Sequence, residues 1–192
     1  MTIRLPCRTL GMAAFFAFLL YSACQGSWGQ SASPENRIKA VYLKNMLNFV
    51  RWPVSTAPAK DGAFRFCVEA DAPLGFALAQ ELRTTTIDDR RVEVRWAQKE
   101  QHLKDCQALF VGASAAKRFA KLLEGVKGAS VHTFGEGNGF LEAGGVVQLS
   151  YESNAVRFGV NLTAARTAGL RMDPRLLGVA KRVVKPGEMP GG

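Results

Sequence analysis

The sequence predicts a three-layer α/β domain with a largely parallel sheet, flanking helices and a C-terminal β-hairpin. Strand and helix patterns alternate through the middle of the chain, an order that favours parallel strands joined by helices. The segment Cys106–Ser114 contains a short apolar run, Ala108–Val111, closed by small residues, which indicates a buried strand entering a turn. Two further apolar runs on either side of Glu152–Asn154 indicate the hairpin.

The first half of the domain begins with a helix. Ser33 can cap it, Pro34 suits its first turn, and an apolar face that starts at Ile38 continues to Trp52, where Pro53 ends the helix. The elements predicted next are a strand at 64–70 covered on both faces, a helix at 71–82, a strand at 92–96 with one face in water, an irregular piece at 98–105, the strand after Cys106 and a helix at 116–126.

The second half ends in two helices. Asp173 and Pro174 form a good start for the second of them. The predicted elements are a strand at 129–133, a glycine-rich loop at 135–145, hairpin strands at 146–150 and 155–160, helices at 161–170 and 175–184, and a loose tail at 185–192.

The N-terminus has the three parts of a secretory signal. Residues 1–29 combine a positively charged start, the apolar run Leu10–Leu20 and small residues that permit cleavage after Gly29. The apolar run is shorter than the ~20 residues that a membrane span needs. We therefore expect export, with 30–34 as a short segment before the domain. The alternatives are an uncleaved anchor and a lipoprotein lipidated at Cys24.

Loss of this leader leaves two cysteines, Cys67 and Cys106. An even pair in an oxidising compartment predicts a disulfide, and the alternative is two buried free thiols. A bond between them would close a loop of roughly 40 residues, which the chain-entropy model values at about 3–4 kcal/mol.

The formal net charge of +9 does not indicate nucleic-acid binding. Lysine and arginine are scattered, with only short clusters at Arg90-Arg91 and Lys181-Arg182, and no basic stripe alternates with aromatic residues. A solvated basic surface, or one matched to an acidic partner or to anionic lipid heads, is the preferred interpretation.

No catalytic or metal-binding constellation is predicted. His102 and His132 have no partners at metal-ligand spacing, and no Gly-x-Ser-x-Gly elbow occurs. The glycine-rich run Gly135–Gly139 lacks the Gly-Lys-Ser/Thr of a P-loop and precedes a strand, so it is interpreted as a flexible turn. The pair Asp88-Asp89 is interpreted as a solvated turn. We expect neither an enzyme nor a cofactor.

Three arginines are the candidate binding residues. Arg157, Arg166 and Arg171 flank the last hairpin strand and the helix after it, near the end of the sheet where ligand sites of α/β proteins tend to form. Ordinary surface solvation is the alternative for each of them.

Six segments, in order and spacing, resemble the YfiR family of periplasmic proteins over about residues 35–184. They are Tyr42–Pro53, Phe66–Val68, Asp105–Val111, Gly144–Val147, Phe158–Leu162 and Leu176–Ala180. The resemblance implies a periplasmic repressor that holds the periplasmic domain of an inner-membrane diguanylate cyclase inactive. It thereby lowers cyclic di-GMP, biofilm formation and exopolysaccharide output. It also implies sequestration by an outer-membrane lipoprotein of the OmpA/Pal type, dimerisation, and an influence of disulfide redox state on activity.

The resemblance bears on individual residues too. Cys67 and Cys106 match one disulfide of the family's founding member, whereas the region Leu141–Gln148 lacks the cysteines of its second disulfide. Arg171 lies in the region where the family binds small ligands. The alternative functions are a periplasmic small-ligand sensor without a cyclase partner and an exported hydrolase.

Overall fold

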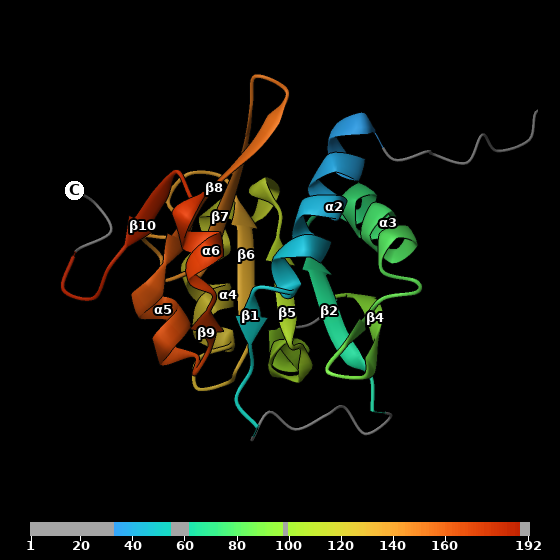
Figure 1. Ribbon diagram of the computed structural model, residues 1–192, viewed down its shortest axis with the longest axis horizontal. Helices are drawn as coiled ribbons and strands as arrows, with labels where there is room; N and C mark the ends of the chain where they lie inside the picture. Colours follow the sequence, from blue (N-terminus) through green and yellow to red (C-terminus); the bar gives the residue numbers. More distant parts are fainter. Residues whose placement is uncertain (1–32, 55–61, 98–99, 189–192) are drawn as a thin grey trace, which may run out of the picture. The chain divides into compact units, whose positions relative to one another are not determined.

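The computed structural model describes residues 33–54, 62–97 and 100–188 and confirms the predicted fold class (Figure 1). The predicted signal segment, residues 1–29, and residues 189–192 of the predicted tail lie outside these residues. Eight strands form one sheet in the order β10-β8-β7-β6-β5-β2-β4-β3, and five of its seven pairings are parallel. The strands are β2 (Phe64–Glu69), β3 (Thr86–Ile87), β4 (Arg90–Trp96), β5 (Ala108–Val111), β6 (His132–Glu136), β7 (Val147–Glu152), β8 (Ala155–Asn161) and β10 (Arg182–Val184).

Helices cover both faces of the sheet. The α-helices are α2 (Pro34–Leu47), α3 (Ala72–Glu81), α4 (Phe119–Gly125), α5 (Leu162–Thr167) and α6 (Pro174–Gly178), and the 3-10 helices are η2 (Glu100–Asp105) and η3 (Ala113–Arg118). Side chains of β5 alternate between two buried clusters: Ala108 and Phe110 pack with α2 and α3, whereas Leu109 and Val111 pack with α4. The two clusters form the two halves of a three-layer core.

Polar residues at the predicted positions start the helices. The Ser33 hydroxyl accepts a hydrogen bond from the backbone N–H of Asn36 at 3.2 Å, and the Asp173 carboxylate accepts one from the N–H of Arg175 at 2.8 Å. Such caps satisfy backbone donors that the first helical turn leaves without partners.

The first helix is shorter than predicted. It ends at Leu47, and Val50–Arg51 forms strand β1, which pairs antiparallel with β9 (Arg171–Met172). Tertiary contacts account for the difference, because the Trp52 indole donates to the Gln107 carbonyl at 3.0 Å and draws the segment out of the helix.

Two further predicted boundaries were wrong. The helix expected at 175–184 ends at Gly178, and Arg182–Val184 becomes β10 because it pairs in parallel with β8. The strand expected at 129–133 begins at His132 and runs to Glu136. The hairpin is confirmed, and Ser153 and Asn154 have φ angles of 50° and 58°, as its tight turn requires.

The glycine-rich loop holds a buried aromatic ring. Phe140 is fully buried, and a Cβ atom added at Gly135 or Gly145 would lie 2.2 Å or 2.1 Å from its ring. These two glycines are therefore packing positions, in addition to any part they play in the turn.

We expect Gly135→Ala to destabilise the protein by about 1–3 kcal/mol, because the added methyl overlaps the Phe140 ring in a packed core. Gly178→Ala is the matched control: its Cβ would meet nothing within 4 Å. Urea denaturation of both variants tests this, and equal stabilities would contradict the packing role.

Candidate functional site

A disulfide lies at the centre of the candidate site. Cys67 is on β2 and Cys106 immediately precedes β5, and because these strands are neighbours the two Cα atoms are 5.9 Å apart. The structure bonds the two sulfur atoms, as expected from the cysteine count. Both side chains are buried, at 5% and 3% exposure, and belong to the cluster that packs against α4.

The register of the sheet brings two arginines to the disulfide. Arg65 precedes Cys67 by two residues on β2, so both side chains point to the same face. On the neighbouring β4, Arg95 is the register partner of Cys67, and Glu93 is the partner of Arg65. In-register residues of parallel strands share a face, so all four side chains lie on one side of the sheet.

These residues surround a pocket of about 400 Å³. Its walls come from β2, β4 and the residue that follows it, η2 and the segment before β5, and include Arg65, Arg95, His102, Leu103, Asp105 and the disulfide. Leu103 is fully buried and forms an apolar part of the wall, whereas His102 and Asp105 are exposed. The site is thus a hollow with an apolar base and charged groups at its rim.

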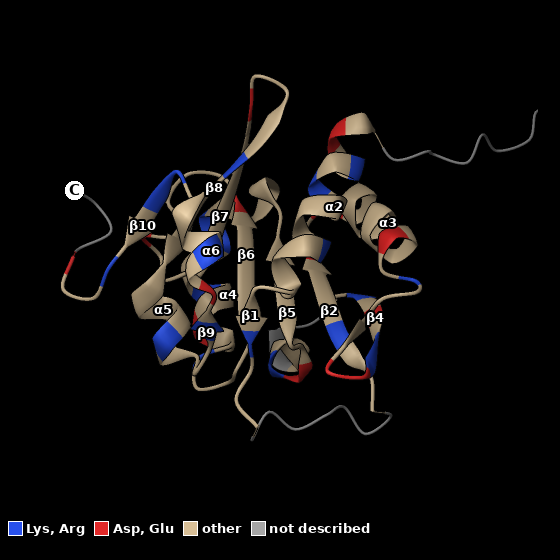
Figure 2. Ribbon diagram, in the orientation of Figure 1, with Lys and Arg blue, Asp and Glu red and all other residues tan. Residues whose placement is uncertain are grey.

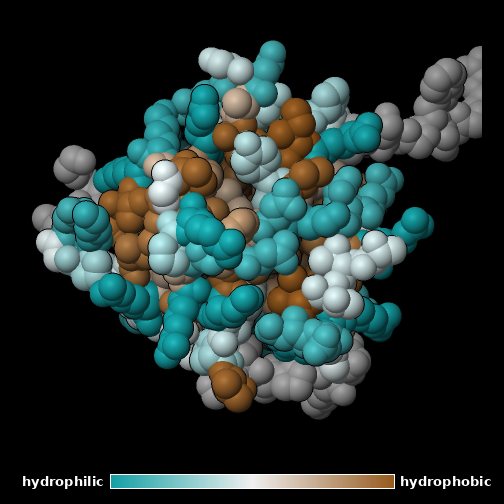
Figure 3. Space-filling model, viewed as in Figure 1, coloured by the Kyte–Doolittle hydropathy of each residue, from teal (hydrophilic) through white to brown (hydrophobic). Residues whose placement is uncertain are grey.

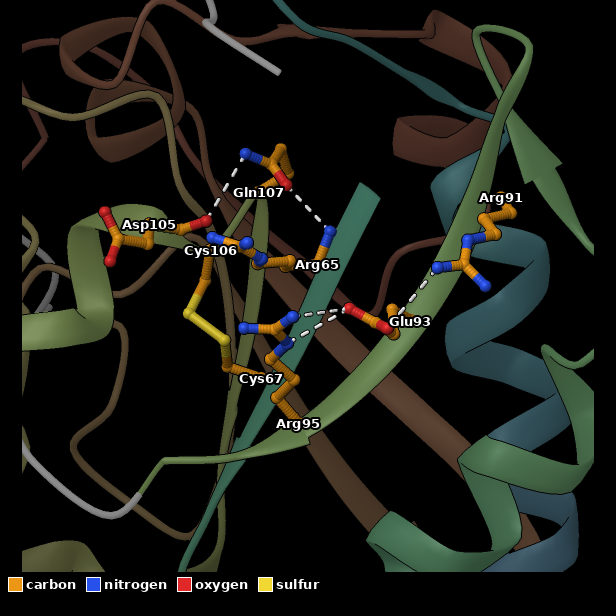
Figure 4. A network of polar contacts seen from close by, with 8 residues as sticks. All are labelled: Arg65, Cys67, Arg91, Glu93, Arg95, Asp105, Cys106 and Gln107. Atoms are coloured by element: carbon orange, nitrogen blue, oxygen red, sulfur yellow. Dashed lines mark hydrogen bonds and ion pairs between the residues drawn. A yellow bond between two sulfur atoms is a disulfide. The ribbon is translucent and has the colours of Figure 1, made fainter. Parts of the chain in front are cut away.

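Hydrogen bonds fix the charged groups (Figure 4). The Glu93 carboxylate accepts hydrogen bonds from Nε and Nη2 of Arg95, at 3.1 Å and 2.8 Å. Arg91, two residues before Glu93 on β4, places its Nη2 atom 3.7 Å from the same carboxylate. The buried Gln107 side chain accepts from the backbone N–H of Arg65 at 2.7 Å. Glu93 thus lies between Arg95 and Arg91 on β4, and Gln107 joins the backbone of Arg65 to the segment before β5.

The pocket offers arginine side chains as hydrogen-bond donors. Within the residues that the structure describes, no group of three or more His, Cys, Asp or Glu side chains could hold a metal ion. Arginine forks form charge-assisted hydrogen bonds with carboxylates and phosphates.

Sequence reasoning missed Arg65 and Arg95 as site residues. Their position beside Cys67 follows from the parallel pairing of β2 with β4.

The three predicted arginines lie at different places. Arg157 is exposed near the turn of the hairpin, opposite Ser150, and α5, which carries Arg166, follows the other end of β8. Arg171 is exposed on β9, opposite Arg51. The length of β8 thus separates Arg157 from Arg166.

Arg51, Arg171 and Arg175 form a basic cluster around β9 and the start of α6, and Figure 2 shows acidic ribbon, which includes Asp173, between them. Hydrogen bonds from the Arg175 side chain and backbone lower the pKa of Asp173 to about 2, and the charge of Arg51 adds to this shift. The Asp173 carboxylate therefore stays ionised at any ordinary pH and partly neutralises this cluster.

A buried ion pair joins the helical layer to the carboxyl end of β6. The Lys39 ammonium lies 2.5 Å from Glu35 and 2.6 Å from Glu136. Burial acts to lower the pKa of Lys39, but hydrogen bonds and charge from Glu136 and Glu35 outweigh it, and the pKa is raised. The i,i+4 spacing of Glu35 and Lys39 was the only sequence signal of this contact.

Among the described residues, no helix combines the length and apolar character needed to cross a membrane.

Comparison with known proteins gives one family match. A family described as YfiR/HmsC-like matches residues 36–181. Among solved structures, a conserved domain protein from Vibrio cholerae O1 biovar eltor is similar, with a TM-score of 0.51 at 12% sequence identity. The match covers 77% of this chain and 60% of the Vibrio chain. An ABC domain in complex with L-Trp from Streptococcus pneumoniae has a TM-score of 0.49 at 9% identity, with coverage of 73% and 60%. The chain thus spans about 60% of the length of these two structures, and the first similarity concerns the fold alone.

Proposed function

The chain belongs to the YfiR/HmsC-like family, and from this membership we propose that it is a periplasmic negative regulator of an inner-membrane diguanylate cyclase. It binds the periplasmic domain of the cyclase and lowers cyclic di-GMP, and with it biofilm formation and exopolysaccharide output. The match over residues 36–181 carries the proposal. The Cys67–Cys106 disulfide supports it, because such bonds persist in oxidising compartments.

An exposed surface suited to a protein partner supports the same proposal. Tyr42 and Val179 are large apolar residues with 39% and 73% exposure, and together with Arg157 and Lys181 they line a hollow of about 420 Å³. Figure 3 shows apolar surface on the face that carries α2 and α6, interrupted by hydrophilic side chains. Aromatic residues and arginine are enriched in protein interfaces. We propose this surface, with Arg157 as the basic member of it, for the cyclase contact.

The remaining expectations are proposals of the same kind. The first is cleavage after Gly29, which a mass spectrum of the periplasmic protein tests. The others are sequestration by a lipoprotein of the OmpA/Pal type and homodimer formation.

A small-ligand sensor without a cyclase partner is the second candidate function, favoured by the pocket beside the disulfide. The two functions are compatible, since a ligand can act by changing affinity for a partner.

Deletion of the gene is expected to raise cellular cyclic di-GMP, and the wild-type gene should restore the original level. We expect a Val179→Glu copy to restore it poorly, because the charge disrupts the apolar surface without a buried contact to lose. Val54→Glu is the matched control at another exposed valine. The measurement is cyclic di-GMP per cell, with the amount of periplasmic protein checked for each copy.

An unchanged cyclic di-GMP level on deletion would overturn the regulator proposal and leave the sensor function. Equal rescue by both valine variants would overturn only the assignment of the surface.

A further inference from the structure

We propose that the pocket beside the Cys67–Cys106 disulfide binds a small organic oxyanion, a molecule that carries a carboxylate or a phosphate group. The site is separate from the Tyr42–Val179 surface, since the two share no lining residue. The proposal does not depend on regulation of a cyclase.

Charge selects an anion. Among the lining residues that the structure describes, Arg65 and Arg95 contribute two guanidinium groups and Asp105 one carboxylate. The Asp105 carboxylate is 61% exposed and lies 3.6 Å from His102 Nδ1 at the rim. Arg65 is half-buried beside the disulfide, where a charge is less screened by water than at the open surface.

The geometry favours a group with several acceptor oxygens. Arg65 and Arg95 come from neighbouring strands and point to the same face, and Figure 4 shows both guanidinium groups directed toward the disulfide. Glu93 holds Arg95 through Nε and Nη2, which fixes the orientation of its guanidinium plane. Two guanidinium groups on one face of the sheet, one of them oriented by Glu93, match the oxygens of a carboxylate or phosphate, as single point charges would not.

Size and lining limit the ligand to a small molecule. A volume of about 400 Å³ is near the lower end of ligand pockets, which run from roughly 300 to 1,000 Å³. Leu103, Ala97 and the disulfide give the pocket apolar walls, which suit a short carbon skeleton attached to the anionic group. A metal cation is disfavoured, because two arginines would repel it.

Calorimetric titration of the purified protein with succinate and with inorganic phosphate tests the proposal. Both anions are used at low ionic strength because salt screens such contacts. We expect saturable binding of at least one of them, and the stronger binder tells whether the natural ligand carries a carboxylate or a phosphate. Succinamide, which has the same skeleton without charge, should not bind.

Three variants localise the binding. Arg95→Gln and Arg65→Gln should each weaken the affinity by about tenfold or more, the effect of losing one charge-assisted pair. Arg91→Gln is the matched control: it removes the same charge from the same strand and the same Glu93 neighbour, but Arg91 does not line the pocket. We expect it to change the affinity less than about twofold.

Two outcomes of these measurements would overturn the proposal. Absence of saturable binding of both anions at millimolar concentration would overturn the proposal. An equal loss in Arg91→Gln and Arg95→Gln would also overturn it, because it would show attraction by general surface charge. If Arg65→Gln fails to fold, the comparison of Arg95→Gln with Arg91→Gln decides alone.

Discussion

Replacing both bonded cysteines, as Cys67→Ala with Cys106→Ala, is expected to lower the free energy of unfolding by at least about 3–4 kcal/mol, the value of the bond alone. The bond joins residues 39 positions apart and closes a loop that contains α3, β3, β4 and η2. Without it, the unfolded chain gains the conformations that the closed loop forbids. The measurement is urea denaturation of the variant beside the oxidised wild-type protein.

Reduced wild-type protein is the control for this prediction. The cysteine side chains are buried, so alanine also removes packed atoms, and reduction separates this loss from loss of the bond. We expect the reduced wild type to be intermediate between the oxidised protein and the double variant. Overlapping denaturation curves for all three samples would show that the bond adds no stability.

The fold was predictable where local chemistry decides it. Alternation of apolar runs with helical patterns predicted a largely parallel sheet between helices, and Ser33 and Asp173 marked helix starts that the structure confirms. Prediction failed at the short pieces that pair over long distances. Val50–Arg51 and Arg182–Val184 are strands because β9 and β8 offer them backbone partners, and no local pattern carries that information.

The candidate site was predictable in part for the same reason. The cysteine count predicted the bond between Cys67 and Cys106, since only these two cysteines lie outside the predicted leader. Arg65 and Arg95 were not found, because their place beside the disulfide depends on the register in which β4 pairs with β2. The missing information is tertiary, and a residue's type and spacing along the chain do not contain it.

Burial also escaped sequence reasoning, most clearly at His132. Its ring is fully buried between aromatic neighbours, with its centroid 6.2 Å from that of Trp52 and 4.1 Å from that of Phe134. Neither ring nitrogen has a hydrogen-bond partner among the described residues. Burial lowers the pKa of His132 from 6.5 to about 3, because the apolar surroundings disfavour the charged imidazolium.

We expect this histidine to make the protein sensitive to acid. Below pH 6.5 the unfolded chain binds a proton at His132, whereas the folded protein does not until about pH 3. The unfolded state then holds more protons, so the free energy of unfolding falls as the pH falls, by up to about 1.4 kcal/mol per pH unit. Above pH 6.5 both states are neutral at this position and the effect vanishes.

His132→Leu should remove this dependence. Between pH 6.5 and pH 4 the wild type is expected to lose about 3 kcal/mol more than the variant, while carboxylates that titrate in both proteins contribute equally and cancel. At pH 7 the variant should be at least as stable, because leucine fills the space without leaving buried polar atoms unbonded.

The second histidine provides the control. His102→Gln leaves the buried His132 ring in place, so this variant should keep the acid sensitivity assigned to His132, measured by urea denaturation at each pH. Parallel curves for the wild type and His132→Leu would contradict the prediction, because they would mean that His132 takes up its proton equally in the folded and unfolded states. A flattened curve for His132→Leu alone would identify this buried ring as a main source of the protein's acid sensitivity.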